Sequence, residues 1–111
     1  MNNCTFVGRL SSDPEIRDVG NSSLTTFSLA IEEYRRDKDG TKKKRVDFFE
    51  FEAWDSGGTT IHKFCKKGDM IAIHACARQQ KWVNSEGKSM QKTNFRVQSF
   101  KLLCGKENRN D

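Results

Sequence analysis

The 111-residue sequence lacks a long apolar run and a secretion signal, and these absences narrow the class of protein. No stretch approaches the ~18 consecutive apolar residues from which a membrane-spanning helix is recognised. The first ten residues, MNNCTFVGRL, contain neither the charged region nor the apolar core of a signal peptide. We therefore expect a cytoplasmic protein with no membrane partner.

The chain also lacks a dense cysteine framework and any Cys-x-x-Cys pair, since its cysteines are widely spaced at Cys4, Cys65, Cys76 and Cys104. In a reducing compartment such cysteines are most simply free thiols. His62 with Cys65, or His74 with Cys76, would supply half of a metal site, but no partner pair stands at zinc-finger spacing. We expect packing roles for both pairs, and we predict neither a metal nor a cofactor.

Catalytic motifs are missing as well. The chain has no Gly-rich phosphate loop, no Gly-x-Ser-x-Gly and no His-Glu-x-x-His. Asp47, Glu50 and Glu52 leave a metal-dependent nuclease open as an alternative. Glu50 and Glu52 stand between aromatic residues, however, where carboxylates would keep a strand face soluble. We predict no catalytic residues and no enzymatic activity.

Apolar residues are scarce for a freestanding domain, at 34% hydrophobic against 32% charged. A chain of this length forms one domain that buries roughly two thirds of its unfolded surface. The segment Met70–Val83 is largely apolar on both of its alternating faces. Either the short helix or a terminus covers its outer face, or a second subunit does, and we favour the subunit. We therefore expect a homo-oligomer.

The most informative segment that is present is Val46–Trp54, VDFFEFEAW. Side chains of a strand alternate between two faces, so Phe49, Phe51 and Ala53 share a core face. Phe48 and Trp54 share the other face with two carboxylates, which need water. Large rings on a wetted strand face indicate a flat partner, and nucleic acid bases are flat.

The order of the expected elements predicts the fold. Strands are expected at Cys4–Leu10, Leu24–Tyr34, Val46–Trp54, Met70–Val83 and Gln91–Leu103, with a short strand at Glu15–Val19. Thr59 or Thr60 would cap a short helix that runs to about Cys65. This order predicts an all-β fold, a five-stranded Greek-key OB-fold barrel with one short helix between strands 3 and 4. We assign residues 1–104 to this domain and residues 105–111 to a short disordered C-terminal tail.

Basic charge is concentrated between Arg35 and Arg45, where seven cations and two acids give +5, the net charge of the whole chain. Such a segment suits a polyanion, although a solvated hairpin tip would look the same. Each candidate stacking ring stands near cations. The predicted base-stacking residues are Tyr34, Phe48, Trp54 and Trp82. The predicted phosphate-binding residues are Arg35, Arg36, Lys38, Lys42, Lys43, Lys44, Arg45, Arg78 and Lys81.

These motifs together resemble the bacterial single-stranded DNA-binding protein family. The resemblance rests on FVGRLSSDPEIR, TFSLAIEEYRRDKDG, FEAWDSGGTTIHKFCKKGDMIAI and QQKWVNSEGKS. It implies sequence-independent binding and protection of single-stranded DNA in replication, recombination and repair, by a bacterial homo-oligomer, commonly a tetramer, with a dimer as the alternative. By position it implies the same four stacking residues.

One departure concerns the C-terminus, because members of that family usually end in an acidic tip that recruits partners, and this chain stops without one. Recruitment through such a tail is therefore in doubt. The protein is either trimmed to its domain or a specialised form from a phage or mobile element. The residues alone also leave open an OB-fold adaptor that holds a protein or RNA.

Overall fold

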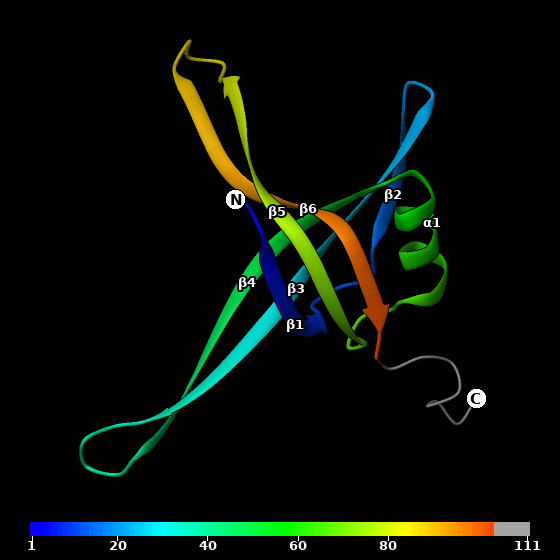
Figure 1. Ribbon diagram of the computed structural model, residues 1–111. Coiled ribbons are helices and arrows are strands. Elements are labelled where there is room, and N and C mark those ends of the chain that lie inside the picture. The colour runs from blue at the N-terminus through cyan, green and yellow to red at the C-terminus, as the bar shows by residue number, and fades with distance from the viewer. Residues whose placement is uncertain (104–111) are drawn as a thin grey trace.

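The computed structural model describes residues 1–103, which form a closed β-barrel with one helix (Figure 1). The elements are β1 (Cys4–Leu10), β2 (Glu15–Val19), β3 (Ser22–Arg36), β4 (Lys42–Trp54), α1 (Asp55–Phe64), β5 (Met70–Val83) and β6 (Ser89–Leu102). The strand order is β1-β5-β6-β4-β3-β2, and an additional β1–β3 pairing closes the barrel. Five strands thus form the barrel, while β2 extends it beyond β3. The predicted OB-fold with a helix between its third and fourth barrel strands is confirmed.

The core lies on the faces that the alternation predicts. Phe27 and Leu29 of β3 and Phe51 of β4 are buried. The Phe27 and Phe51 rings stack with centroids 5.3 Å apart, and Phe6 of β1 meets the edge of Phe51 at 5.2 Å. Phe49 packs at the rim of this cluster, 5.5 Å from Phe6. Because odd-numbered positions of β4 fill the barrel, its even-numbered positions face outward.

Helix α1 begins at Asp55 with Trp54 at its N-cap, so the predicted cap at Thr59 or Thr60 is wrong. The Thr59 hydroxyl donates instead to the Asp55 carbonyl within the helix, at 3.0 Å. Asp55 adopts a left-handed backbone, with φ of 56°, and its Oδ1 accepts the Ser23 N–H at 3.2 Å. Aspartate tolerates this conformation better than most residues, so it turns the chain directly from strand into helix.

Gly58 explains why this early start is possible. It is buried in the first turns of α1, against the Ala53 carbonyl and the Thr25 side chain. A Cβ at this position would approach Thr25 Oγ1 to 2.7 Å, so only glycine lets the helix approach the sheet this closely. Ile61 and Cys65 are buried beneath this helix, whereas Phe64 is 48% exposed.

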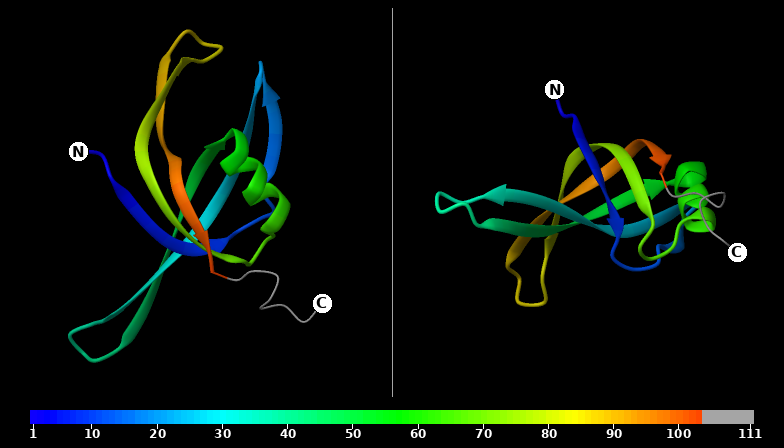
Figure 2. Two further views of the ribbon diagram at one scale, coloured as in Figure 1. Left: turned by 45° about the vertical axis from the view of Figure 1, so that its right-hand side comes forward. Right: turned by 90° about the horizontal axis from the view of Figure 1, so that it is seen from below.

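Two long hairpins extend from the barrel in different directions, one formed by β3–β4 and one by β5–β6 (Figures 1 and 2). The predicted basic loop is largely strand, since Arg35 pairs with Lys43 and Arg36 with Lys42. The turn is confined to 37–41, with Gly40 at a φ of +83° as its Asp-Gly signal predicts. We call residues 32–46 the basic arm.

Some expectations fall on residues that the structure does not describe. The domain boundary at 104, the disorder of 105–111 and the state of Cys104 all lie outside residues 1–103. Within the described part, Cys4 and Cys76 are free thiols. No helix there is long and apolar enough to cross a membrane, and no three metal-ligating side chains come together.

Candidate nucleic-acid interface

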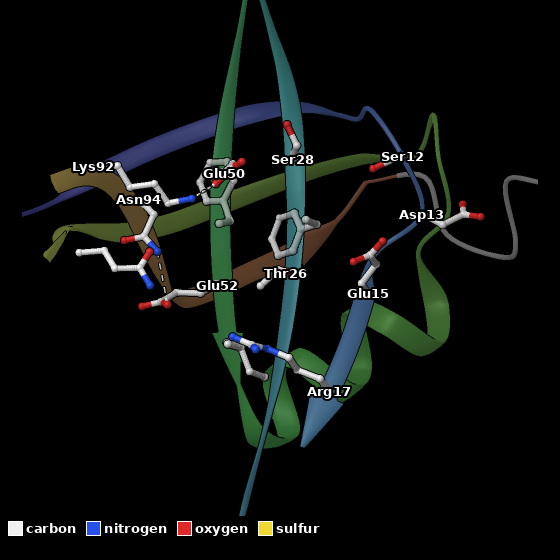
Figure 3. Close-up of a pocket in the computed structure, with 14 residues that line it drawn as sticks. Ser12, Asp13, Glu15, Arg17, Thr26, Ser28, Glu50, Glu52, Lys92 and Asn94 are labelled. Atoms are coloured by element: carbon white, nitrogen blue, oxygen red, sulfur yellow. Dashed lines mark hydrogen bonds and ion pairs between the residues drawn. The ribbon is translucent and has the colours of Figure 1, made fainter. Parts of the chain in front are cut away.

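A groove of about 410 Å³ lies on the outer face of β3 and β4, between β2 on one side and the β5–β6 hairpin on the other. Figure 3 shows its floor formed by two strands and its sides by separate elements. Its polar lining comprises Ser12, Asp13, Glu15, Arg17, Thr26, Ser28, Glu50, Glu52, Gln80, Lys92 and Asn94. The groove therefore joins residues from five segments that are distant in the sequence.

Phe48 and Trp54 bracket this groove, because positions 48, 50, 52 and 54 of β4 point to the same side. Six residues of extended strand separate the two rings by roughly 20 Å. Phe48 is 63% exposed, so its ring is available to a base. Trp54 is half-buried, and the Arg96 guanidinium lies over its ring at 6.0 Å. Its indole N–H is buried without an acceptor among the described residues.

Tyr34 continues the same face onto the basic arm. It stands opposite Lys44 in the β3–β4 register, four pairs beyond the pair of Ala30 with Phe48. The ring is 55% exposed, and Lys42 Nζ lies over it at 4.7 Å. Tyr34 is thus placed to stack on a base while a cation holds its other face.

Trp82 lies on the other hairpin, near its tip. It pairs with Met90, and it shares a side of β5–β6 with Gln80 and Lys92, which line the groove. The ring is 43% exposed. Because the two hairpins diverge from the barrel, Trp82 and Tyr34 lie on different arms (Figure 1). Three of the four predicted stacking residues therefore lie along one face of β3–β4, and Trp82 lies on the other hairpin.

The predicted phosphate-binding cations fall into two groups. In the first, acids hold the cations: Lys43 pairs with Asp37 at 2.8 Å, Lys44 with Glu32 at 3.3 Å and Arg45 with Asp47 at 3.0 Å. In the second, no ion pair forms within residues 1–103, and this group comprises Arg35, Arg36, Lys38, Lys42, Arg78 and Lys81. The free cations are the stronger candidates, because exposed ion pairs must be exchanged before a phosphate can bind.

Because side chains alternate between the two faces of a β-strand, the same cations divide between the two sides of each hairpin. Arg36 and Lys42 share the side of the basic arm that carries Tyr34, whereas Arg35 and Lys43 pair on the opposite side. On the second hairpin, Arg78 shares the side of Trp82, and Lys81 faces away from it. A DNA strand that contacts all four rings would therefore meet only some of the predicted phosphate-binding cations.

Two ionisable groups of the basic arm are perturbed. The Thr41 backbone N–H donates to Asp39 Oδ1 at 2.9 Å and, with the Thr41 side chain, lowers the pKa of that carboxyl below its usual 3.8. The hydrogen bond to Asp47 raises the pKa of the Arg45 guanidinium. Both shifts favour the charged forms of these two side chains.

The sequence analysis missed the cations of β6. Lys92 pairs with Glu50 at 2.8 Å, and Arg96 pairs with Glu52 at 3.0 Å. Both reach the carboxylates of β4 because β6 runs beside β4, with Phe51 opposite Phe95 and Glu52 opposite Arg96. A parallel pairing between strands 40 residues apart leaves no signal in local alternation, so only the folded chain reveals it.

Comparison with known proteins agrees with this architecture. Residues 1–103 match the sequence profile described as the single-strand binding protein family. The chain belongs to that family. A curated relative, single-stranded DNA-binding protein 1 of Lactococcus lactis subsp. lactis, is 31% identical over 104 residues, 93% of this chain and 68% of the relative. Single-stranded DNA-binding protein 1 of Streptococcus pyogenes is 28% identical, covering 97% of this chain and 82% of the relative.

Solved structures share the fold at lower sequence identity. A Plasmodium falciparum structure titled as an SSB complex with ssDNA superposes with a TM-score of 0.82 at 23% identity, over 93% of this chain and 95% of that one. A deletion mutant of the single-stranded DNA-binding protein from Thermus aquaticus also has a TM-score of 0.82, at 15% identity, covering 93% and 50% of the two chains. At these identities the likeness supports the barrel architecture alone.

Proposed function

We propose that this member of the single-strand binding family binds single-stranded DNA by stacking bases on Tyr34, Phe48, Trp54 and Trp82, without requiring a particular sequence. The observation that carries the proposal is the exposure of Phe48 and Tyr34 on the outer face of β3 and β4, where core packing does not explain them. Duplex DNA hides the faces of its bases, so exposed rings favour unpaired strands. Stacking tolerates any base, since every base has a π-face.

Phosphates would be held by the cations around these rings. Arg36 and Lys42 lie beside Tyr34, and Arg78 shares the side of Trp82. A DNA strand that wraps around the two hairpins would also contact the other predicted cations, which are Arg35, Lys38, Lys43, Lys44, Arg45 and Lys81. Protection of single strands during replication, recombination and repair is the general role of this family. We infer the same role here, in the cytoplasm of a bacterial cell.

We infer that the working form is a homo-oligomer, with a tetramer as the state that the family resemblance favours. In the described part of the chain, β1 pairs with β5 along one edge but with β3 only at Arg9 and Leu10. The remaining edge, Cys4–Gly8, leaves backbone groups open to pair with a second copy. Val7 is 51% exposed beside it. Sedimentation at several concentrations should give a mass above that of one chain, and a monomer throughout would contradict this inference.

The experiment that tests DNA binding is a titration of labelled oligo-dT at several salt concentrations. Each phosphate neutralised on a single strand contributes about −0.7 to the slope of log affinity against log salt. Arg36→Ala should make this slope shallower by about that amount, because Arg36 is unpaired on the side of Tyr34. Lys43→Ala removes the same charge from an ion-paired residue on the opposite side and should change the slope less.

Two results would contradict the proposal in different ways. If the wild-type protein does not bind oligo-dT, an adaptor role for the barrel becomes the better explanation. The proposal also holds that the chain acts by binding alone. Shortening of a labelled strand on incubation with Mg²⁺ would therefore show the nuclease activity that Glu50 and Glu52 left open.

A further inference from the structure

The groove between the stacking residues is acidic, although the surrounding arms are basic. Four carboxylates and two cations are among its lining residues, which leaves a net charge of −2: Asp13, Glu15, Glu50 and Glu52 against Arg17 and Lys92. A phosphate on the groove floor would lie beside carboxylates of the same sign. A bound DNA strand should therefore turn its phosphates toward the two hairpins and the edges of its bases toward the floor of the groove.

Glu50 is the carboxylate that such an edge would meet. Its side chain is 66% exposed, whereas that of Glu52 is only 14% exposed. Both Glu52 oxygens already accept hydrogen bonds, from Arg96 Nε at 3.0 Å and from Asn94 Nδ2 at 3.4 Å. Glu50 accepts one, from Lys92 Nζ at 2.8 Å, on Oε2 (Figure 3). An ionised carboxylate has about four acceptor positions, so most of those on Glu50, which lines the groove, remain available to a ligand.

The position of Glu50 relative to Phe48 makes this contact geometrically accessible. The two residues lie on the same side of β4, separated by about 7 Å of strand. A base stacked on Phe48 therefore holds its edge within reach of the Glu50 side chain. The ion pair with Lys92 restrains the carboxylate in this place, because it ties β4 to the adjacent β6.

We propose that Glu50 reads the Watson–Crick edge of the stacked base and favours guanine over thymine. Guanine presents two adjacent donors, N1–H and the 2-amino group, which match the two oxygens of one carboxylate. Cytosine and adenine present one amino group each. Thymine presents its single N3–H between two carbonyl oxygens, which the carboxylate repels. The groove would thus add a base preference to stacking, which has none of its own; this rests on the proposed DNA binding.

The test compares two alternating oligonucleotides of equal length, one of thymine and guanine and one of thymine and hypoxanthine, in lithium salt so that quadruplexes are not stabilised. Hypoxanthine is guanine without the 2-amino group, so stacking and backbone are matched. Wild-type protein should bind the guanine strand at least about fivefold more tightly, the lower end of what a bidentate side-chain–base contact provides. The ratio should fall toward one in Glu50→Gln.

Glu33→Gln is the matched control, because it removes the same charge from an exposed residue of the basic arm, opposite Arg45 and on the other side of β3 from the groove. It should leave the ratio of the two affinities unchanged. If Glu50→Gln raises the affinity for both strands by one factor and keeps their ratio, Glu50 acts only as a charge and the proposal is overturned. Equal wild-type affinity for both strands also overturns it, whereas binding of neither strand would overturn the proposed function itself.

Discussion

Phe48→Ala separates the stacking role from a structural one more cleanly than any other substitution in this chain. Phe48 stands on the outer face of β4 and is 63% exposed, while Phe51, three residues later, is 2% exposed in the barrel core. The two residues share a side-chain type and a strand. They differ only in the face to which alternation assigns them.

The expected magnitudes follow from these exposures. Truncating a buried phenylalanine costs about 3–5 kcal/mol of stability, and only about a third of the Phe48 side chain is buried. Phe48→Ala should therefore lower the free energy of unfolding by about 1 kcal/mol. Loss of one stacking platform should weaken binding by about 1–3 kcal/mol, a fall in oligo-dT affinity of roughly 5- to 150-fold. Phe51→Ala should instead cost the full 3–5 kcal/mol of stability.

Two measurements on each variant test this reasoning. Urea unfolding gives the change in stability, and anisotropy of a labelled oligo-dT gives the change in affinity. The reasoning fails if Phe48→Ala binds as tightly as the wild type. It also fails if Phe48→Ala loses as much stability as Phe51→Ala, since the ring would then be part of the core.

Two further predictions concern the helix start and the basic arm. Gly58→Ala should destabilise the domain by more than 1 kcal/mol, because its Cβ would approach Thr25 Oγ1 to 2.7 Å. Gly57→Ala, whose Cβ would lie 3.7 Å from Phe100, is the control and should be tolerated in thermal unfolding. NMR titration should show the Asp39 carboxyl losing its proton below pH 3.8, because the Thr41 backbone N–H stabilises the charged form. The turn contact should then weaken only as the pH falls through that lowered pKa, and a midpoint at or above 3.8 would contradict this cause.

Local alternation predicted most of the barrel because each strand has one face that must be buried. In β4 the pattern assigns Phe51 and Ala53 to the core and Phe48 to the outside, and both assignments hold. Local signals do not locate the start of α1, for which the sequence predicts Thr59 or Thr60 as the cap. The start of that helix depends on Gly58 fitting against β3, which is a tertiary contact and leaves no periodic signal.

The groove was less predictable than the rings around it. The positions of exposed aromatic residues follow from the alternation of side chains within one strand. The groove, in contrast, needs β6, β4, β3 and β2 to lie in this order in the sheet. Lys92 and Arg96 therefore entered no prediction, although they hold Glu50 and Glu52 in the folded chain. The sequence analysis explained those carboxylates as solubilising residues, since their partners are more than 40 positions away.

The acidic groove also changes how the basic arm should be understood. If charge alone held the DNA strand, carboxylates at the centre of the binding surface would only weaken its binding. The exposed ring of Phe48 and the half-buried ring of Trp54, at the two ends of the groove, give the DNA strand a reason to cross this region. Stacking on them does not depend on the charge of the groove floor. Charge on the arms and stacking over the groove are therefore separable contributions. High salt should remove the first and spare the second, so the affinity lost in Phe48→Ala should stay nearly constant from low to high salt, whereas the affinity lost in Arg36→Ala should shrink.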